Sequence, residues 1–234
     1  MSEAPAFLFR VRLRRDAPIQ ALARVLLPDD EDRRIGTAHR LLWTLFADDH
    51  ARTRDFLWRE VDGERLDRLA FLILSARPPE DRHRLFEIDP PKPWAPALRS
   101  GDRLGFSLRA NPVVAQRQAG ERGKRQDVVM RALHLIPSGD RATQRAALVA
   151  EKGREWLGSQ GCRHGFQPDD GLRVDGYLRR RVARESGEPV MFSTLDFDGT
   201  LKVIDPDLFV AAVRRGFGSA KAWGCGLMLI RRLR

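Results

Sequence analysis

The chain has few cysteines and no long apolar run. Its 234 residues include two cysteines, Cys162 and Cys225, which are too few and too isolated for a disulfide framework or a zinc site. Its five histidines include no pair with metal-ligand spacing. No run is long enough to cross a bilayer, and the first residues are not a signal peptide. We therefore expect a cytoplasmic protein with no metal, no other cofactor and no membrane partner.

Acidic residues are outnumbered by basic ones. The chain has 42 lysines and arginines against 32 aspartates and glutamates, which gives a net charge of +10 at pH 7. The excess is mainly arginine, and it recurs in short clusters along the chain: 33–34, 124–125, 179–181, 214–215 and 231–232. Guanidinium groups pair with phosphates through two hydrogen bonds, so this composition favours an anionic polymer as the partner.

The order of predicted elements indicates an α+β protein with two tandem ferredoxin-like (RRM-like, βαββαβ) domains. In the second half, we expect a strand at 128–136, a helix at 139–158, strands at 172–182 and 190–203, a helix at 206–215 and a strand at 227–230, which is the split βαβ order. In the first half, we expect strands at 7–15, 56–61, 69–74 and 104–109 and a helix at 35–46 that starts near Gly36 or Thr37 after a polar turn at 28–32. A second helix is poorly marked there. The predicted domains are 1–115 and 128–234, joined by a basic linker at 116–127.

A glycine-rich segment follows the last predicted helix. Gly216, Gly218, Gly224 and Gly226 surround Lys221 in the order G-x-G-x-x-K-x-x-G-x-G. Glycine permits positive φ and a close approach of the backbone to a ligand, and exposed N–H groups beside a lysine suit a phosphate chain. The segment is not a Walker loop, because no Gly-Lys-Ser/Thr closes it, and it lacks the strand-before-helix setting of a dinucleotide fingerprint. A loop needed only for chain reversal is the alternative.

A second motif, Asp196-Phe-Asp198-Gly-Thr200, resembles the nucleophile segment of haloacid dehalogenase phosphatases. That fold needs a long α/β domain downstream, and only 34 residues follow Thr200. We therefore expect Asp198 and Gly199 to form the tight turn of a β-hairpin. A metal-dependent phosphatase or nuclease acting through the two aspartates is the least favoured function.

His39 is the preferred catalytic candidate. It lies at the edge of the apolar face of the helix at 35–46, beside Arg40 and after Arg33-Arg34. Imidazole titrates near neutral pH and suits proton transfer, whereas a histidine with only a structural role is the alternative. His50, His83, His134 and His164 lie in no motif.

Several stretches together resemble the CasE family, the CRISPR precursor-RNA processing endoribonucleases of the Cascade complex in the RAMP superfamily. The resemblance rests on His39-Arg-Leu-Leu-Trp-Thr-Leu-Phe46, on Leu108-Arg-Ala-Asn-Pro112, on Lys124-Arg125, on 150–157 and on the glycine-rich segment. It implies two ferredoxin-like domains and metal-independent cleavage at the 3′ base of each repeat hairpin. The 2′-hydroxyl would attack the phosphate to leave a 2′,3′-cyclic phosphate, and the mature crRNA would stay bound within Cascade.

The resemblance also implies roles for individual residues. His39 matches the catalytic histidine, but Gly36 stands where the family carries a tyrosine. The repeat RNA and other Cascade subunits are the implied partners. A non-catalytic RNA-binding subunit of the same fold is the alternative function. The expected RNA-binding residues are Arg40, Lys124, Arg125, Arg179, Arg180, Arg181, Arg184, Gly216, Gly218, Lys221, Gly224 and Gly226.

Overall fold

The computed structural model describes residues 5–14, 16, 30–46, 53–61, 70–116, 124–183 and 187–233. They form two compact units. The first contains residues up to 96 together with 181–191 and 221–224, and the second contains the described remainder. Segments from late in the chain therefore fold with the N-terminal elements. No helix in the described part of the chain is both long and apolar enough to span a membrane.

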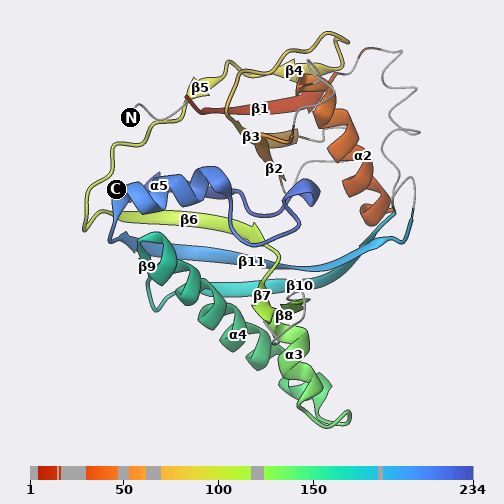
Figure 1. Ribbon diagram of the computed structural model, residues 1–234, viewed down its shortest axis with the longest axis vertical. Helices are drawn as coiled ribbons and strands as arrows, with labels where there is room; N and C mark the ends of the chain where they lie inside the picture. The colour runs from red at the N-terminus through yellow and green to blue at the C-terminus, as the bar shows by residue number, and fades with distance from the viewer. Residues whose placement is uncertain are drawn as a thin grey trace. The chain divides into compact units, whose positions relative to one another are not determined.

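The first unit contains an antiparallel sheet in the order β2-β3-β1-β4 (Figure 1). Its strands are β1 (Phe7–Leu13), β2 (Phe56–Glu60), β3 (Ala70–Ser75) and β4 (Phe86–Ile88), and the short β5 (Lys92–Pro93) also pairs with β1. Helix α2 (Glu31–Trp43) follows β1 in the chain, as the first helix of a ferredoxin-like domain does. Residues 76–85, between β3 and β4, form turns, so the second helix of the motif is missing from this described segment.

Helix α2 begins earlier than the sequence predicts. The side chain of Asp30 accepts a hydrogen bond from the backbone N–H of Arg33 at 2.8 Å and caps the helix. The predicted start at Ile35, with Gly36 or Thr37 near it, is therefore wrong, because all three lie inside the helix. A short 3₁₀ turn (Thr44–Phe46) continues it, and the ring of Phe46 stacks on Phe56 with centroids 4.5 Å apart. This contact joins α2 to the core of the first unit.

The second unit contains the complete βαββαβ motif. Its strands are β6 (Arg103–Ala110), β10 (Arg173–Val182), β11 (Val190–Val203) and β12 (Met228–Arg232), in the order β10-β11-β6-β12, with β9 (Phe166–Pro168) also paired to β11. Helix α4 (Arg141–His164) follows β6 and helix α5 (Pro206–Arg215) follows β11. The sequence places 97–115 in the first domain, whereas β6 is the first strand of this second sheet.

The predicted strand at 128–136 is wrong. Residues Val128–His134 form helix α3, because the side chain of Asp127 accepts a hydrogen bond from the Met130 N–H at 2.7 Å and caps its start. The predicted linker overlaps a small pairing of β7 (Val113–Gln116) with β8 (Lys124–Asp127), and 117–123 lie outside the described residues. The predicted turn at Asp198 and Gly199 is also wrong, because both lie inside β11, opposite Ser107 and Phe106 of β6.

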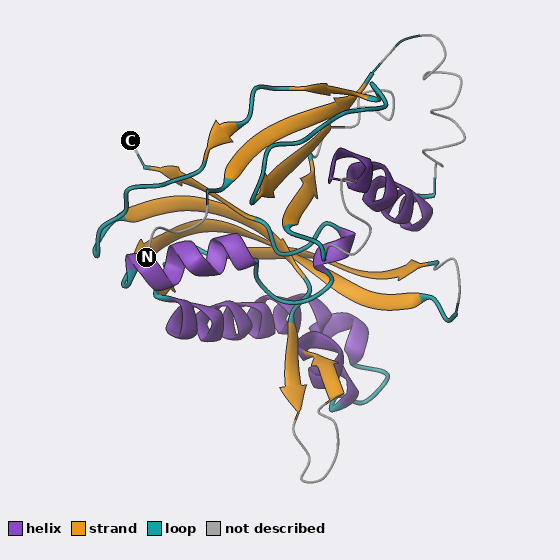
Figure 2. Cartoon of the chain, turned by 45° about the horizontal axis from the view of Figure 1, so that its top comes forward, coloured by secondary structure: helices purple, strands orange, loops and turns teal. Residues whose placement is uncertain are grey.

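Helix α4 packs closely on the sheet of the second unit (Figure 2). Gly153 makes this approach possible, since a Cβ there would lie 2.4 Å from a methyl carbon of Val174. Trp156 stacks on Phe197 of β11 with centroids 5.5 Å apart. The helix ends where Gly165 takes a left-handed conformation at φ 70°. The predicted end at 158 is thus about two turns too early.

Candidate functional site

Three segments of the first unit meet around the imidazole of His39. Helix α2 carries His39 itself, β2 carries Trp58, and the late segment 221–224 contains a 3₁₀ turn (Lys221–Trp223). The indole N–H of Trp58 donates to the carbonyl of Ala222 at 3.1 Å, which holds this turn on β2. The Trp223 ring then lies 5.1 Å from the His39 ring, centroid to centroid. The predicted histidine and part of the glycine-rich segment therefore share one site.

Trp43 contacts His39 from one helical turn further along α2. Its indole N–H donates to Nε2 of His39 at 3.0 Å. The indole is itself held edge-on against Phe56, with centroids 5.4 Å apart. Because Nε2 accepts this bond, the neutral imidazole carries its proton on Nδ1.

The surroundings of His39 disfavour its charged form. Burial lowers the pKa of His39 to about 4, and the positive charges of Arg54 and then Arg40 contribute to the same effect. The imidazole is therefore neutral at pH 7. A neutral imidazole accepts a proton, so this geometry suits a general base whose lone pair is occupied by Trp43 in the absence of a ligand.

Gly36, which stands where the resemblance implies a tyrosine, lies in a tightly packed position. It is buried in α2, and a Cβ at this position would lie 3.2 Å from a methyl carbon of Val182 at the end of β10. The neighbouring Arg181 N–H donates to the side chain of Asp32 at 3.1 Å. Residues 181 and 182, which belong to the first unit, thus lie against the turn of α2 before His39, and a larger side chain at position 36 requires Val182 to move.

The glycine-rich segment also has structural roles within the second unit. Gly218 has φ 71°, and a Cβ there would lie 2.5 Å from the carbonyl oxygen of Asn111. The Asn111 side chain accepts from the Ser219 hydroxyl at 2.5 Å and donates to the Ser193 carbonyl at 2.8 Å. The N–H of Gly226 donates to the Arg109 carbonyl at 2.7 Å. Two of the predicted motifs, 108–112 and the glycine-rich segment, therefore hold each other in place.

Hydrogen bonds within the protein use several N–H groups that were candidates for phosphate binding. The N–H of Gly216 donates to Ala212 at 2.8 Å, and the N–H of Phe217 donates to the carbonyl of Gly226 at 3.0 Å. Gly224 has φ 77°, and a Cβ there would lie 3.1 Å from the Trp58 ring. Packing thus explains these glycines, and Lys221 remains the candidate of this segment for phosphate binding.

The remaining basic candidates are spread over both units. In the first, Arg40 is exposed on α2, where Nη2 lies 3.3 Å from the hydroxyl of Thr37, and Arg181 is exposed at the end of β10. In the second, Arg125 of β8 and Arg179 of β10 are exposed, and Arg180 is half-buried. The side chain of Lys124 and the whole of Arg184 lie outside the described residues.

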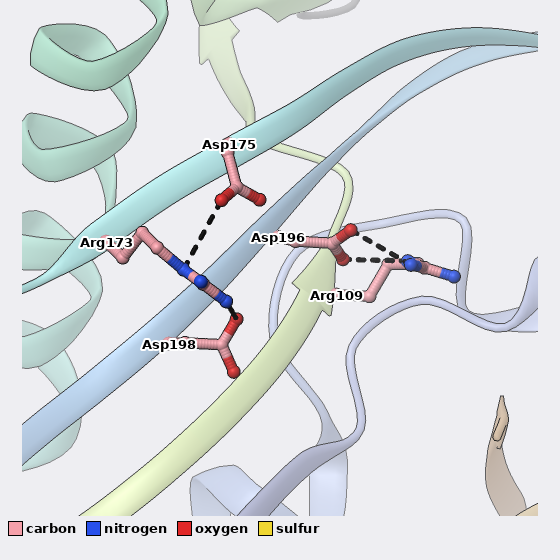
Figure 3. Close-up of polar contacts among 5 residues, drawn as sticks. All are labelled: Arg109, Arg173, Asp175, Asp196 and Asp198. Carbon is pink, nitrogen blue, oxygen red and sulfur yellow. Dashed lines mark hydrogen bonds and ion pairs between the residues drawn. The ribbon is translucent and has the colours of Figure 1, made fainter. Parts of the chain in front are cut away.

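The two aspartates of the phosphatase-like motif are engaged in ion pairs (Figure 3). Asp196 accepts two hydrogen bonds from Arg109, at 2.7 and 2.9 Å. Asp198 pairs with Arg173 at 3.3 Å, and Arg173 also pairs with Asp175 at 3.3 Å. Both aspartates lie on β11 and face basic groups of adjacent strands, so their positions support a structural role.

Sequence reasoning missed three contributors to the site: Trp43, Trp223 and Arg54. Trp43 stands four residues after His39, and residues at this spacing are neighbours on a helix, so this signal was available. Trp223 contacts His39, and the charge of Arg54 acts on it, only through the tertiary fold, so no local pattern marks either residue.

The two sheets define a class of protein with ferredoxin-like domains in tandem, here with a histidine on α2. Within that class, the chain belongs to the CRISPR associated protein family, whose model matches residues 6–232. The predicted resemblance is thereby confirmed.

Named relatives agree with this assignment. The chain is 34% identical over 154 residues to the CRISPR-associated endoribonuclease Cse3 of Thermus thermophilus, a match that covers 62% of this chain and 63% of the relative. It is 25% identical over 208 residues to the Cascade subunit CasE of Escherichia coli, covering 88% and 96% of the two chains. Among solved structures, the endoribonuclease Cse3 bound to a 19-nucleotide RNA matches with a TM-score of 0.67 and 25% identity over 97% of this chain and 99% of that chain.

Proposed function

We propose that the protein is a cytoplasmic endoribonuclease that cleaves the repeat hairpins of CRISPR precursor RNA and keeps the mature crRNA within a Cascade-type complex. The observation that carries the proposal is the neutral, tryptophan-flanked imidazole of His39 in a chain of this family. Relatives named as an endoribonuclease and as a Cascade subunit support the reaction class and the assembly.

The proposed reaction needs no group beyond the RNA and the protein. Nε2 of His39 takes the proton of the 2′-hydroxyl upstream of the cut, and the resulting oxygen forms a bond to the adjacent phosphorus. The bond from phosphorus to the 5′-oxygen breaks, and the imidazolium returns its proton to that oxygen. The products are a 2′,3′-cyclic phosphate and a 5′-hydroxyl.

Substrate binding has to prepare His39 for this step. In the RNA-free site, Nε2 accepts the indole N–H of Trp43, so the 2′-hydroxyl must displace that contact. The phosphate also brings a negative charge towards the cations that lower the pKa of His39. An anion beside the ring favours the imidazolium, so the bound phosphate moves this pKa from about 4 towards the working pH.

Exposed arginines supply the RNA-binding surface in this proposal. An A-form stem is recognised through its shape and phosphates, and arginines spaced along a strand can follow its backbone. Arg179 and Arg181 are both exposed residues of β10. Lys221 lies in the 3₁₀ turn that brings Trp223 to His39, close to where the cut phosphate would bind.

Cleavage of a labelled repeat hairpin, with enzyme in excess and a chelator present, tests the function. His39→Ala should lower the single-turnover rate by roughly 10² to 10⁴ while leaving hairpin affinity nearly unchanged. His83→Ala is the matched control, since His83 is exposed in a turn of the same unit. A substrate with a 2′-deoxy nucleotide at the cut site should stay intact.

Two other results would refute the proposal in different ways. Tight binding of an intact hairpin by the unmodified protein would identify a non-catalytic RNA-binding subunit. Cleavage by His39→Ala within about threefold of the unmodified rate would remove His39 from the chemistry, because general acid–base catalysis contributes far more than that.

A further inference from the structure

Arg54 is near enough to the proposed catalytic histidine for its charge to act on the imidazole, and its guanidinium is incompletely satisfied. We propose that Arg54 is the phosphate-binding residue of this site and that it holds a non-bridging oxygen of the phosphodiester to be cut. The inference deepens the proposed endoribonuclease function and rests on it for the identity of the ligand.

The first observation is the buried, unsatisfied donor. Nη1 of Arg54 is closed to solvent and has no hydrogen-bond partner among the residues that the structure describes. Burial of a charged donor without a partner costs free energy, so such groups in native proteins call for a specific explanation. A ligand that accepts from Nη1 provides one.

The second observation concerns the acidic residue beside Arg54 in the chain. Asp55 is its immediate neighbour, but the Asp55 carboxylate pairs with Nε of Arg77 at 2.8 Å. Arg77 also donates to the carbonyl of Phe46 at 2.9 Å. Asp55 is thus engaged by Arg77, and no described carboxylate bonds to Nη1 of Arg54.

The third observation is the position of Arg54 relative to the reacting group. Arg54 stands two residues before Phe56, the first residue of β2, and Phe56 contacts the Trp43 ring that binds His39. After burial, the charge of Arg54 has the largest effect on the imidazole, ahead of Arg40. Burial also lowers the pKa of Arg54 itself, as expected for a cation withdrawn from water.

These observations fit a phosphodiester better than a neutral ligand. The planar guanidinium matches the oxygens of a phosphate, and a charge-assisted bond in a partly dry site is stronger than one in water. As the 2′-oxygen attacks, negative charge grows on the non-bridging oxygens. A fixed cation at this position stabilises that charge most in the transition state.

Inorganic phosphate tests the site without any cleavage. The NMR signals of His39, in protein with labelled histidine, give its pKa with and without phosphate. We expect phosphate to raise the pKa in the unmodified protein and in the control Arg82→Gln, whose exposed side chain pairs with Glu80 in the same unit. Arg54→Gln should lose the response. A response that persists in Arg54→Gln, or one that is missing in the unmodified protein, would overturn the inference.

Cleavage gives the second readout. Arg54→Gln should lower the single-turnover rate by roughly 10² to 10³, the usual effect of losing one donor to a developing oxyanion, and should change hairpin affinity much less. Arg54→Lys should recover part of the rate, and unchanged thermal unfolding would show that both variants fold. A rate unaffected in Arg54→Gln would reject the role.

The two experiments separate this inference from the proposed function. If the unmodified protein cuts no repeat RNA but its phosphate response depends on Arg54, the anion site stands and the endoribonuclease function falls. If the unmodified protein cuts RNA through His39 but the response of the His39 pKa to phosphate is the same in Arg54→Gln, the function is supported and the inference is refuted.

Discussion

Replacing Trp43 with phenylalanine should make His39 a stronger base. The indole N–H donates to Nε2 at 3.0 Å, and this bond exists only while Nε2 is unprotonated. It therefore stabilises the neutral imidazole. Phenylalanine removes the donor but keeps an aromatic ring to pack against Phe56. The pKa of His39 should rise, and the proton of the neutral ring should no longer be confined to Nδ1.

The size of the effect follows from the energy of one hydrogen bond. A net contribution of about 0.5 to 1.5 kcal/mol corresponds to a rise in pKa of about 0.4 to 1.1. His39 should then titrate near pH 4.4 to 5.1, starting from about 4. The rise is limited because burial and the two arginines, which Trp43→Phe does not change, account for most of the lowering.

NMR of labelled histidine measures both the pKa and the tautomer. Trp94→Phe is the matched control, because Trp94 belongs to the same unit and its indole makes no hydrogen bond to the described residues. Since Trp43 competes with the 2′-hydroxyl for Nε2, Trp43→Phe should also cleave repeat RNA at least as fast as the unmodified protein. An unchanged pKa and tautomer, or a rate lower by more than about tenfold, would show that Trp43 does not cap the base.

Three further predictions concern stability and binding. The pKa of His39 is lowered from 6.5 to about 4 in the folded protein, so the unfolded chain binds more protons than the folded one between these pH values. The free energy of unfolding should therefore fall as the pH drops from 7 to 5, and it should fall by less in His39→Gln. Urea unfolding at each pH measures this. Gly36→Tyr should lower the free energy of unfolding by about 1 to 3 kcal/mol, because the new side chain meets Val182; an unchanged denaturation midpoint would mean that β10 yields freely. Lys221→Ala should weaken hairpin binding with a nearly unchanged melting temperature, and unaltered affinity would leave the glycine-rich segment with a structural role alone.

Elements with a regular spacing of apolar residues, or with clear capping residues at their ends, could be predicted from the sequence. Helix α5 occupies the predicted 206–215, where Asp205 caps the start and Gly216 follows the end. Strand β11 matches the predicted 190–203. The predicted helix at 35–46 was right in type, and its end at 46 is the end of the 3₁₀ turn that continues α2 beyond Trp43. Its start was missed because Asp30 was assigned to a polar turn instead of a cap.

Short apolar runs and long-range pairings could not be predicted. Residues 128–134 open with two β-branched valines, and periodicity cannot distinguish a short buried strand from a short helix. The hydrogen bond from the Met130 N–H to the side chain of the N-cap residue Asp127 stabilises the helix. The assignment of β6 to the second sheet depends on its partners β11 and β12, which lie far along the chain. No local pattern carries that information.

The candidate site divides in the same way. His39 was found through residue type, its place on the helix and the family resemblance. The lowered pKa of His39 could not be predicted, because its burial, the nearby charge of Arg54 and the contact with Trp223 depend on segments that are distant in sequence. Gly36 illustrates the limit further: the sequence shows that the tyrosine is missing, but only the structure shows Val182 facing that position.

The resting site opposes indiscriminate cleavage of RNA. Its base is weak, since the pKa of His39 is about 4, and its lone pair is occupied by Trp43. An RNA that binds without placing its phosphate correctly contacts an imidazole with little tendency to take a proton. A hairpin that places a phosphate against Arg54 supplies the negative charge that strengthens the base and the hydroxyl that replaces the indole. Because both changes require correct placement of the same phosphodiester, cleavage depends on binding geometry more steeply than affinity does. In this proposal, the selectivity of the nuclease therefore resides in the coupling of Arg54, Trp43 and His39 as well as in the arginines that hold the stem.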